Sequence, residues 1–175
     1  MKKRSKNTGQ TFNLTGHIEA ETRNAVTGDL VQRVEADNLV LNTCLNHLGT
    51  LLTTGGAPFT IGGGVIGIGN VAPTGTDTGI TGPQLKAALT AAGMASATGS
   101  LGTRVLQYSW AYATNEATTT AGGANVFTEV GLCVNSAGTF PNANTLYTRA
   151  THGAITKSTD VTLSYTYTLN LAAVV

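Results

Sequence analysis

Hydrophobic and polar residues alternate most regularly near the end of the chain, between Thr159 and Leu171. Successive side chains of a strand point to opposite faces, so this pattern predicts a strand with one buried and one solvent-facing side. The solvent-facing side would carry small polar groups with one acid. Such a face is poorly suited to catalysis and well suited to docking against another protein. The two faces are Val161, Leu163, Tyr165, Tyr167, Leu169 and Leu171, against Asp160, Thr162, Ser164, Thr166, Thr168 and Asn170.

Shorter patterns of the same kind predict further strands. Residues 12–36 have the form of a hairpin around the turn-forming residues 24–29, where Gly28 can adopt a positive φ. We expect seven or eight strands in all. Those after the hairpin are expected over residues 59–69, 104–114, 126–134, 146–152 and the terminal segment described above.

A leucine stripe predicts a helix after the hairpin. Apolar residues recur at spacings of three and four between Leu41 and Leu52, as they do on one face of a helix. Asp37 and Asn38 precede the stripe and are good N-terminal caps. The stripe is too short for sustained heptads, so we expect it to be the core face of the helix.

A second helix is expected over residues 81–93. Thr81 and Gln84 have the spacing of a capping box, and Pro83 suits a first helical turn. We expect a loop over residues 94–103. Together the patterns predict a single mainly β domain, sandwich or jelly-roll-like, with two short helices.

The composition suggests how such a domain is used. Hydrophobic residues make up 41% of the 175 residues, enough for a sizeable core, but charged residues make up only 11%. Ordinary soluble domains have about 25% charged residues. Because a free monomer usually needs more charge to stay soluble, we expect assembly into a larger object. The plainer alternative is a low-charge extracellular or viral β-domain without a special interface.

The net charge of +1 hides a basic N-terminal arm, residues 1–11, ahead of a β-sandwich domain over residues 12–175. Such an arm can contact nucleic acid, an acidic protein surface or a membrane, or remain a solvated tail. Four charges without interleaved aromatic residues are too few to indicate nucleic-acid binding. The residues of this candidate interaction arm are Lys2, Lys3, Arg4 and Lys6.

Two features bear on compartment. We expect no signal peptide and no membrane partner, because no segment has a signal-peptide core or the ~20 apolar residues of a membrane-spanning helix. Cys44 and Cys133 lie in apolar surroundings, so we expect buried, reduced thiols and synthesis in a reducing cytoplasm.

Motifs that suggest chemistry lack their required context. The segment 67–72, Gly-Ile-Gly-Asn-Val-Ala, resembles a dinucleotide-binding fingerprint, but an extended loop is expected after it where the fingerprint needs a helix. His17, His47 and His152 are not at metal-ligand spacing, and no nucleophile-elbow motif is present. We therefore predict no catalytic, cofactor-binding or metal-binding residues, and no enzyme.

Glu129 is an acid within an otherwise apolar predicted strand, and Arg149 lies in the next one. A cross-strand ion pair between them is plausible, with Arg104 as a competing partner. We expect the Glu129–Arg149 pair to be structural and to fix the strand register.

Four ordered stretches resemble a broad group of small virion proteins of tailed bacteriophages, which include capsid decoration, head-fibre and tail-fibre-like proteins. The resemblance covers about residues 12–171, and the chain differs from the group in having few charges over residues 87–100. The stretches are Asn-Leu-Val-Leu-Asn at 38–42, the loop ending in Thr-Asp-Thr at 66–78, Phe-Thr-Glu-Val-Gly-Leu at 127–132, and a closing hairpin at 146–150 and 155–163.

The resemblance implies a virion structural protein, made in the host cytoplasm, with no catalytic motif. A capsid decoration or cement protein is favoured, with the major capsid protein or other virion proteins as partners and a homo-oligomer, dimer or trimer. Alternatives are a tail-fibre, collar or baseplate component, or a virion glycan-binding module using an exposed Tyr147 or Phe140. An enzyme such as a glycan depolymerase is disfavoured because no paired carboxylates are evident.

Overall fold

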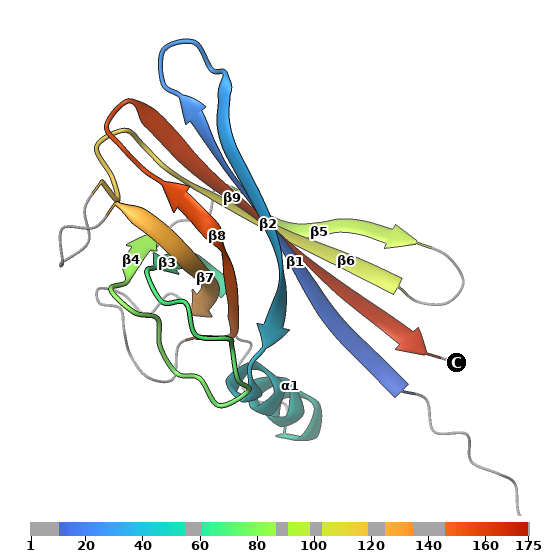
Figure 1. Cartoon of the computed structure of the whole chain (residues 1–175). Coiled ribbons are helices and arrows are strands. Elements are labelled where there is room, and N and C mark those ends of the chain that lie inside the picture. Colours follow the sequence, from blue (N-terminus) through green and yellow to red (C-terminus); the bar gives the residue numbers. More distant parts are fainter. Residues whose placement is uncertain are drawn as a thin grey trace, which may run out of the picture.

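One antiparallel sheet contains all nine strands of the described part of the chain (Figure 1). The computed structural model describes residues 11–54, 61–86, 91–98, 103–118, 125–134 and 146–174. The strands are hydrogen-bonded in the order β4-β3-β7-β8-β2-β1-β9-β6-β5. The elements are β1 (Thr11–Asn24), β2 (Leu30–Val40), α1 (Asn42–Thr54), β3 (Ile61–Gly67), β4 (Gln84–Lys86), β5 (Ala91–Thr98), β6 (Thr103–Tyr112), β7 (Val126–Val134), β8 (Thr148–Thr156) and β9 (Val161–Val174). The mainly β prediction is confirmed.

The terminal strand β9 lies inside this sheet, between β1 and β6. It pairs with β1 from Thr11 opposite Val174 to Asn24 opposite Val161. The alternation expected from the sequence is confirmed, because its apolar positions from Val161 to Leu169 are buried and the polar positions between them are half-buried.

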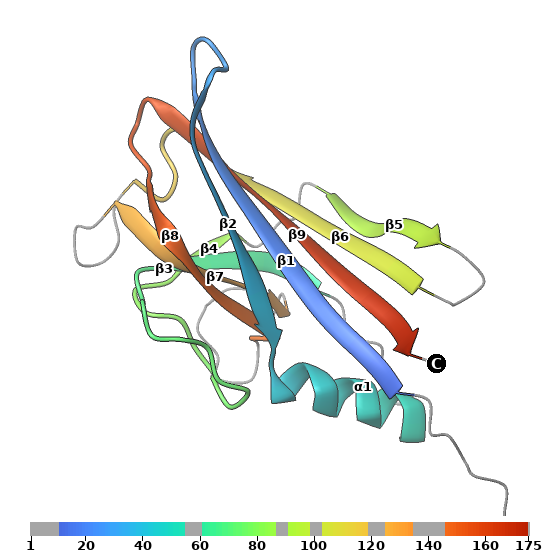
Figure 2. The ribbon, with the colours of Figure 1, turned by 45° about the vertical axis from the view of Figure 1, so that its right-hand side comes forward.

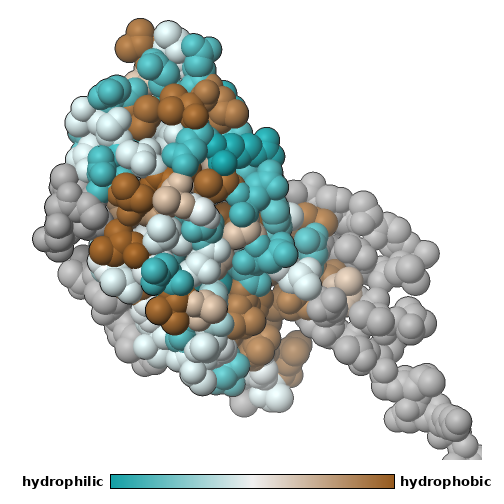
Figure 3. Space-filling view, in the orientation of Figure 1, coloured by the Kyte–Doolittle hydropathy of each residue, from teal (hydrophilic) through white to brown (hydrophobic). Residues whose placement is uncertain are grey.

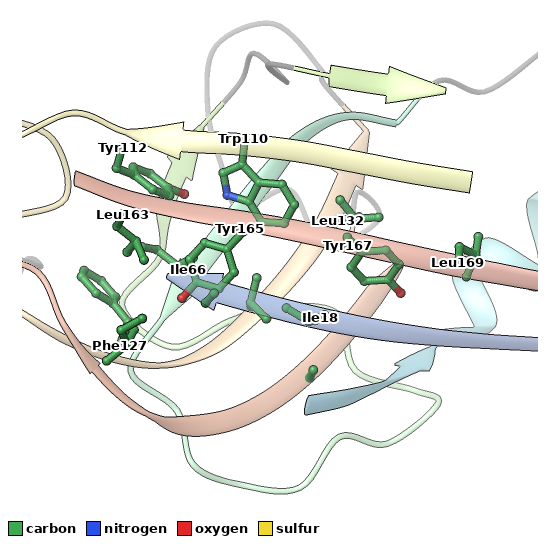
Figure 4. Close-up of a cluster of buried hydrophobic side chains, with 14 residues drawn as sticks. Ile18, Ile66, Trp110, Tyr112, Phe127, Leu132, Leu163, Tyr165, Tyr167 and Leu169 are labelled. Atoms are coloured by element: carbon green, nitrogen blue, oxygen red, sulfur yellow. The ribbon is translucent and has the colours of Figure 1, made fainter. Parts of the chain in front are cut away.

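The sheet curls on itself, so that β3 and β4 come into contact with β6 and nearly close it. Aromatic side chains from β6, β7 and β9 fill the interior (Figure 4). The rings of Trp110 and Tyr165 stack at 5.3 Å with an interplanar angle of 9°. A Cβ atom on Gly64 of β3 would lie 2.0 Å from the Trp110 ring, so only glycine lets the indole pack against that strand.

The hairpin of β1 and β2 has the turn that the sequence indicates. The side-chain oxygen of Asn24 accepts hydrogen bonds from the amides of Val26 and Thr27, and Gly28 has a φ of 77°. On the outer face, Glu19 and Glu35 lie directly opposite each other, and Arg33 bridges them at 3.0 and 2.7 Å. This cation offsets the repulsion between the two acids.

The helix differs from the expectation in its start and in its exposed face. Strand β2 continues to Val40, so Asp37 and Asn38 are strand residues and not caps. Figure 2 shows α1 beyond the end of β2, running beneath the start of β1. Among the described side chains of α1, Cys44 in the first turn is buried and Leu48 is half-buried, so the leucine stripe is not a continuous core face. Leu41 and Cys44 are buried, whereas Leu45, Leu51 and Leu52 are 48%, 37% and 85% exposed.

The second predicted helix is wrong. Its described residues form the end of a loop, at 81–83, then strand β4 and the start of β5, and one helix is present in the described part of the chain. The predicted loop 94–103 is likewise strand where it is described, at residues 94–98 and Thr103. The capping signal is local, whereas β3 and β6 offer β4 and β5 a ladder of backbone partners.

The thiols are as expected. Cys44 and Cys133 are free and buried, and burial raises the pKa of each to about 11, which keeps them protonated at neutral pH. Within the described residues, no helix has the length and apolar character needed to cross a bilayer. The basic arm with Lys2, Lys3, Arg4 and Lys6 lies outside the described residues.

Candidate functional site

The two residues expected to form an ion pair are in contact. Glu129 of β7 and Arg149 of β8 lie on neighbouring antiparallel strands. The Nε and Nη2 atoms of Arg149 donate to Oε2 of Glu129 at 2.9 and 2.7 Å. Glu129 is fully buried, and the Arg149 side chain is 8% exposed. Arg104, the alternative partner, lies on β6 opposite Leu171.

The second oxygen of Glu129 holds the loop that links β3 to β4. Oε1 accepts the backbone N–H of Gly69 at 2.7 Å and that of Thr81 at 2.6 Å. These two residues stand near the two ends of the loop, so one carboxylate fastens both. A Cβ atom on Gly69 would lie 2.4 Å from Oε1, so a larger residue there would displace the carboxylate.

Arg149 extends the network into the middle of the same loop. Its Nη1 donates to Oδ2 of Asp77 at 2.6 Å, and Asp77 also accepts the amide and the hydroxyl of Thr74 at 2.9 and 2.6 Å. Burial raises the pKa of Asp77, but the hydrogen bonds from Thr74 and the charge of Arg149 outweigh burial, and the net pKa is lowered. Asp77 is therefore ionised at neutral pH.

This network is built to hold a loop and not to move protons. Glu129 accepts four hydrogen bonds, which matches the about four lone-pair sites of a carboxylate. A carboxylate saturated in this way has no acceptor position left for a substrate proton or a metal ion. The loop it fastens projects Val71, which is 70% exposed, and several exposed threonines into solvent.

The other candidate residues do not converge. His152 accepts from Tyr165 or donates to it through Nε2 at 3.2 Å, while its Nδ1 lies 2.7 Å from the Gly153 carbonyl oxygen. His47 is hydrogen-bonded to the hydroxyl of Tyr147. His17 lies beside Asp37 at 3.3 Å on an exposed surface. No cluster of three or more His, Cys, Asp or Glu residues able to hold a metal occurs among the described residues.

Two expectations about ligand recognition can be examined directly. Strand β3 ends at Gly67, and the chain then runs as a loop to Pro83, so no helix N-terminus stands at the glycine motif. Tyr147 is fully buried, so the expectation that it is an exposed aromatic for glycan binding is wrong. Phe140 lies outside the described residues.

Sequence reasoning missed Asp77 and a buried lysine. Asp77 is 72 positions from Arg149, and no local pattern connects them. Lys157 is fully buried, and its Nζ donates to the carbonyl oxygens of Thr114 and Ser158 at 3.2 and 2.8 Å. Burial lowers the pKa of Lys157, although nearby acids act in the opposite direction. Its place directly after a predicted strand, next to Ile155 in Ile-Thr-Lys, was the available signal.

Exposed apolar side chains gather at two ends of the domain. The hairpin tip consists of Val26, Leu30 and Val31, which are 94%, 48% and 60% exposed, and appears as hydrophobic atoms at the top of Figure 3. The α1 surface consists of the exposed leucines Leu45, Leu51 and Leu52. Helix α1 contains no charged residue. Apolar groups gathered in this way mark contact surfaces more often than scattered ones do.

Comparison with known proteins adds no relative. No family model, no curated protein and no solved structure matches this chain.

Proposed function

We propose that this protein is a structural component of a bacteriophage virion, and that within the virion it is a capsid decoration or cement protein. The observation that carries the proposal is the α1 surface, an uncharged helix that turns three leucines towards solvent. Because only 11% of the residues are charged, the rest of the surface adds little solubility. Burying these leucines against neighbouring subunits would remove the exposed apolar surface from water.

Two further features support a structural role that depends on contacts with neighbouring proteins. Aromatic side chains fill the interior of the domain, so we expect the protein to act through its surface. The network of Glu129, Arg149 and Asp77 fastens the β3–β4 loop near both ends and in its middle, so we expect the loop to offer a partner a pre-organised surface and to lose little entropy on binding. A standard interface buries roughly 1,600 Å², and many weak contacts of that kind add up over a shell.

The basic arm fits the same proposal. Residues 7–175 carry six basic and nine acidic groups, a net charge of −3, so the four cations at positions 2–6 form a positive cluster on an otherwise acidic chain. On a particle, they would contact an acidic capsid surface. Such a contact is screened at high ionic strength. Deletion of residues 1–7 is expected to weaken attachment and its resistance to salt, measured by co-sedimentation with particles over a salt series.

Copy number tests the function. Quantitative mass spectrometry of particles purified from the phage that carries the gene would give the ratio of this protein to the major capsid protein. A ratio of one to one, or one per few capsid subunits, supports decoration, and a handful of copies per particle places the protein in the tail, collar or baseplate. Absence from particles would overturn the virion proposal.

A matched pair of variants tests the α1 surface within that function. Leu52→Gln together with Leu45→Gln should reduce occupancy on particles, because both side chains lose apolar contact area. Val26→Gln, in a side chain that is 94% exposed, makes the same kind of change at the hairpin tip and shows whether that second apolar surface takes part in attachment. Equal occupancy of the wild type and the double variant would contradict a role for α1 in attachment.

A further inference from the structure

The two edges of the sheet are protected very differently. One edge is β4, which has three residues and ends in Lys86. The other is β5, which has eight residues, Ala-Ala-Gly-Met-Ala-Ser-Ala-Thr, with no charge and no proline. Natural proteins usually protect edge strands by making them short or by placing lysine or proline on them. Edge β4 has two of these protections, and β5 has neither a short length nor a charge.

The free side of β5 offers a row of backbone hydrogen-bonding groups. In the described part of the chain, β5 pairs with β6 alone, and β6 is paired on its other side with β9. Alternate residues of an edge strand direct their N–H and C=O groups away from the sheet. The register shifts between Met94 and Ser96, so the longest regular stretch is Ala91–Met94. A partner strand would fit there.

We propose that β5 pairs with the β5 strand of a second copy, antiparallel across a two-fold axis, and so joins two sheets into one. Such a contact is isologous: both copies contribute β5, and the backbone donors and acceptors of one β5 pair with those of the other. The absence of charge on β5 means that two copies meet without like-charge repulsion.

The position of β5 leaves room for this partner. In Figures 1 and 2, β5 lies with β6 and the ends of β1 and β9 in an arm of the sheet that extends away from β3, β7 and β8. A second copy can therefore approach along β5 without meeting the curled part of the first. This pairing extends the proposed function by naming one partner, yet it can be tested on purified protein without particles.

The test compares self-association of the full chain with that of lysine variants, by light scattering coupled to size exclusion over a concentration series. Ala91→Lys and Ala92→Lys are made as two separate variants. Neighbouring residues of a strand face opposite sides of the sheet, so at least one of the two variants leaves the inner side of the sheet unchanged. Like charges then meet across the two-fold axis, and we expect Kd to rise roughly tenfold. Gln107→Lys, on the doubly paired strand β6, is the charge-matched control and should dimerise normally.

Hydrogen exchange gives a second readout that a nonspecific effect on solubility would not reproduce. Alternate amides of β5 should become protected as concentration rises, while those facing β6 are protected throughout. A dimer lost in at least one alanine variant and kept in the control supports the proposal. A wild-type chain that stays monomeric, or a dimer that persists in both variants, overturns it. A monomer that is nevertheless abundant in particles would overturn β5 pairing and leave the virion function standing.

Discussion

Replacing Arg149 with methionine tests what the buried network contributes to stability. The substitution keeps much of the side-chain length but leaves the fully buried Glu129 carboxylate without its cation. Removing one partner of a buried ion pair typically costs about 3–5 kcal/mol. Glu129 retains the amides of Gly69 and Thr81, so we expect the lower end, about 3 kcal/mol. For a protein of this size, that corresponds to a fall in Tm of roughly 6–12 °C.

Arg33→Met provides the matched control. Arg33 is also surrounded by carboxylates, but its side chain is 46% exposed, and water screens exposed ion pairs so that they contribute little to stability. Calorimetry or circular dichroism of both variants at pH 7 would separate the two environments. A third variant, Arg149→Met with Glu129→Gln, removes the uncompensated charge and should recover part of the loss. If Arg149→Met melts at the same temperature as the wild type or Arg33→Met, the network is not structural.

Two further tests concern a tightly packed glycine and a half-buried histidine. Gly131→Ala should destabilise strongly, since its Cβ would lie 2.3 Å from the backbone oxygen of Thr148, whereas Gly49→Ala in α1 meets nothing within 4 Å and should be neutral or stabilise by about 0.5–1 kcal/mol in urea melts. Burial lowers the pKa of His152, so the unfolded chain binds a proton more readily; stability should fall as pH drops below about 6.5. His152→Gln should flatten this dependence between pH 7 and pH 5.5, and an unchanged profile would show that other groups cause it.

The sequence predicted an element correctly where its local residue pattern matched the burial imposed by the rest of the fold. Strand β9 alternates because one of its faces packs inside the curled sheet and the other does not, so the buried and half-buried positions are also the apolar and polar ones. The β1–β2 hairpin is similar, since Asn24 and Gly28 encode the turn in the residues that form it. The contact between Glu129 and Arg149 followed from an acid in an apolar strand and a base in the next.

The failures came from contacts distant in sequence. The capping signal at Thr81 favours a helix, but the backbone amide of Thr81 is bound by Glu129 and the chain beyond it pairs with β3. The leucines of α1 have helical spacing whether or not anything covers them, and β2 runs on far enough to carry most of the helix past the core. Asp77 joins Arg149 only because the loop folds back, which no periodicity records.

The pairing of β1 with β9 has a consequence for synthesis. Thr11 faces Val174, so the strand made first in the described chain waits for the strand made last. Until β9 emerges from the ribosome, β1 lacks one of its two partner strands, and the inner side of the β1–β2 hairpin, with Ile18 and Ala20, is without the β9 side chains that pack beside it. Pairings of such long range raise the contact order and slow folding, and they leave sheet edges exposed while folding is incomplete. The nascent protein should therefore depend on chaperones more than its short hairpins suggest.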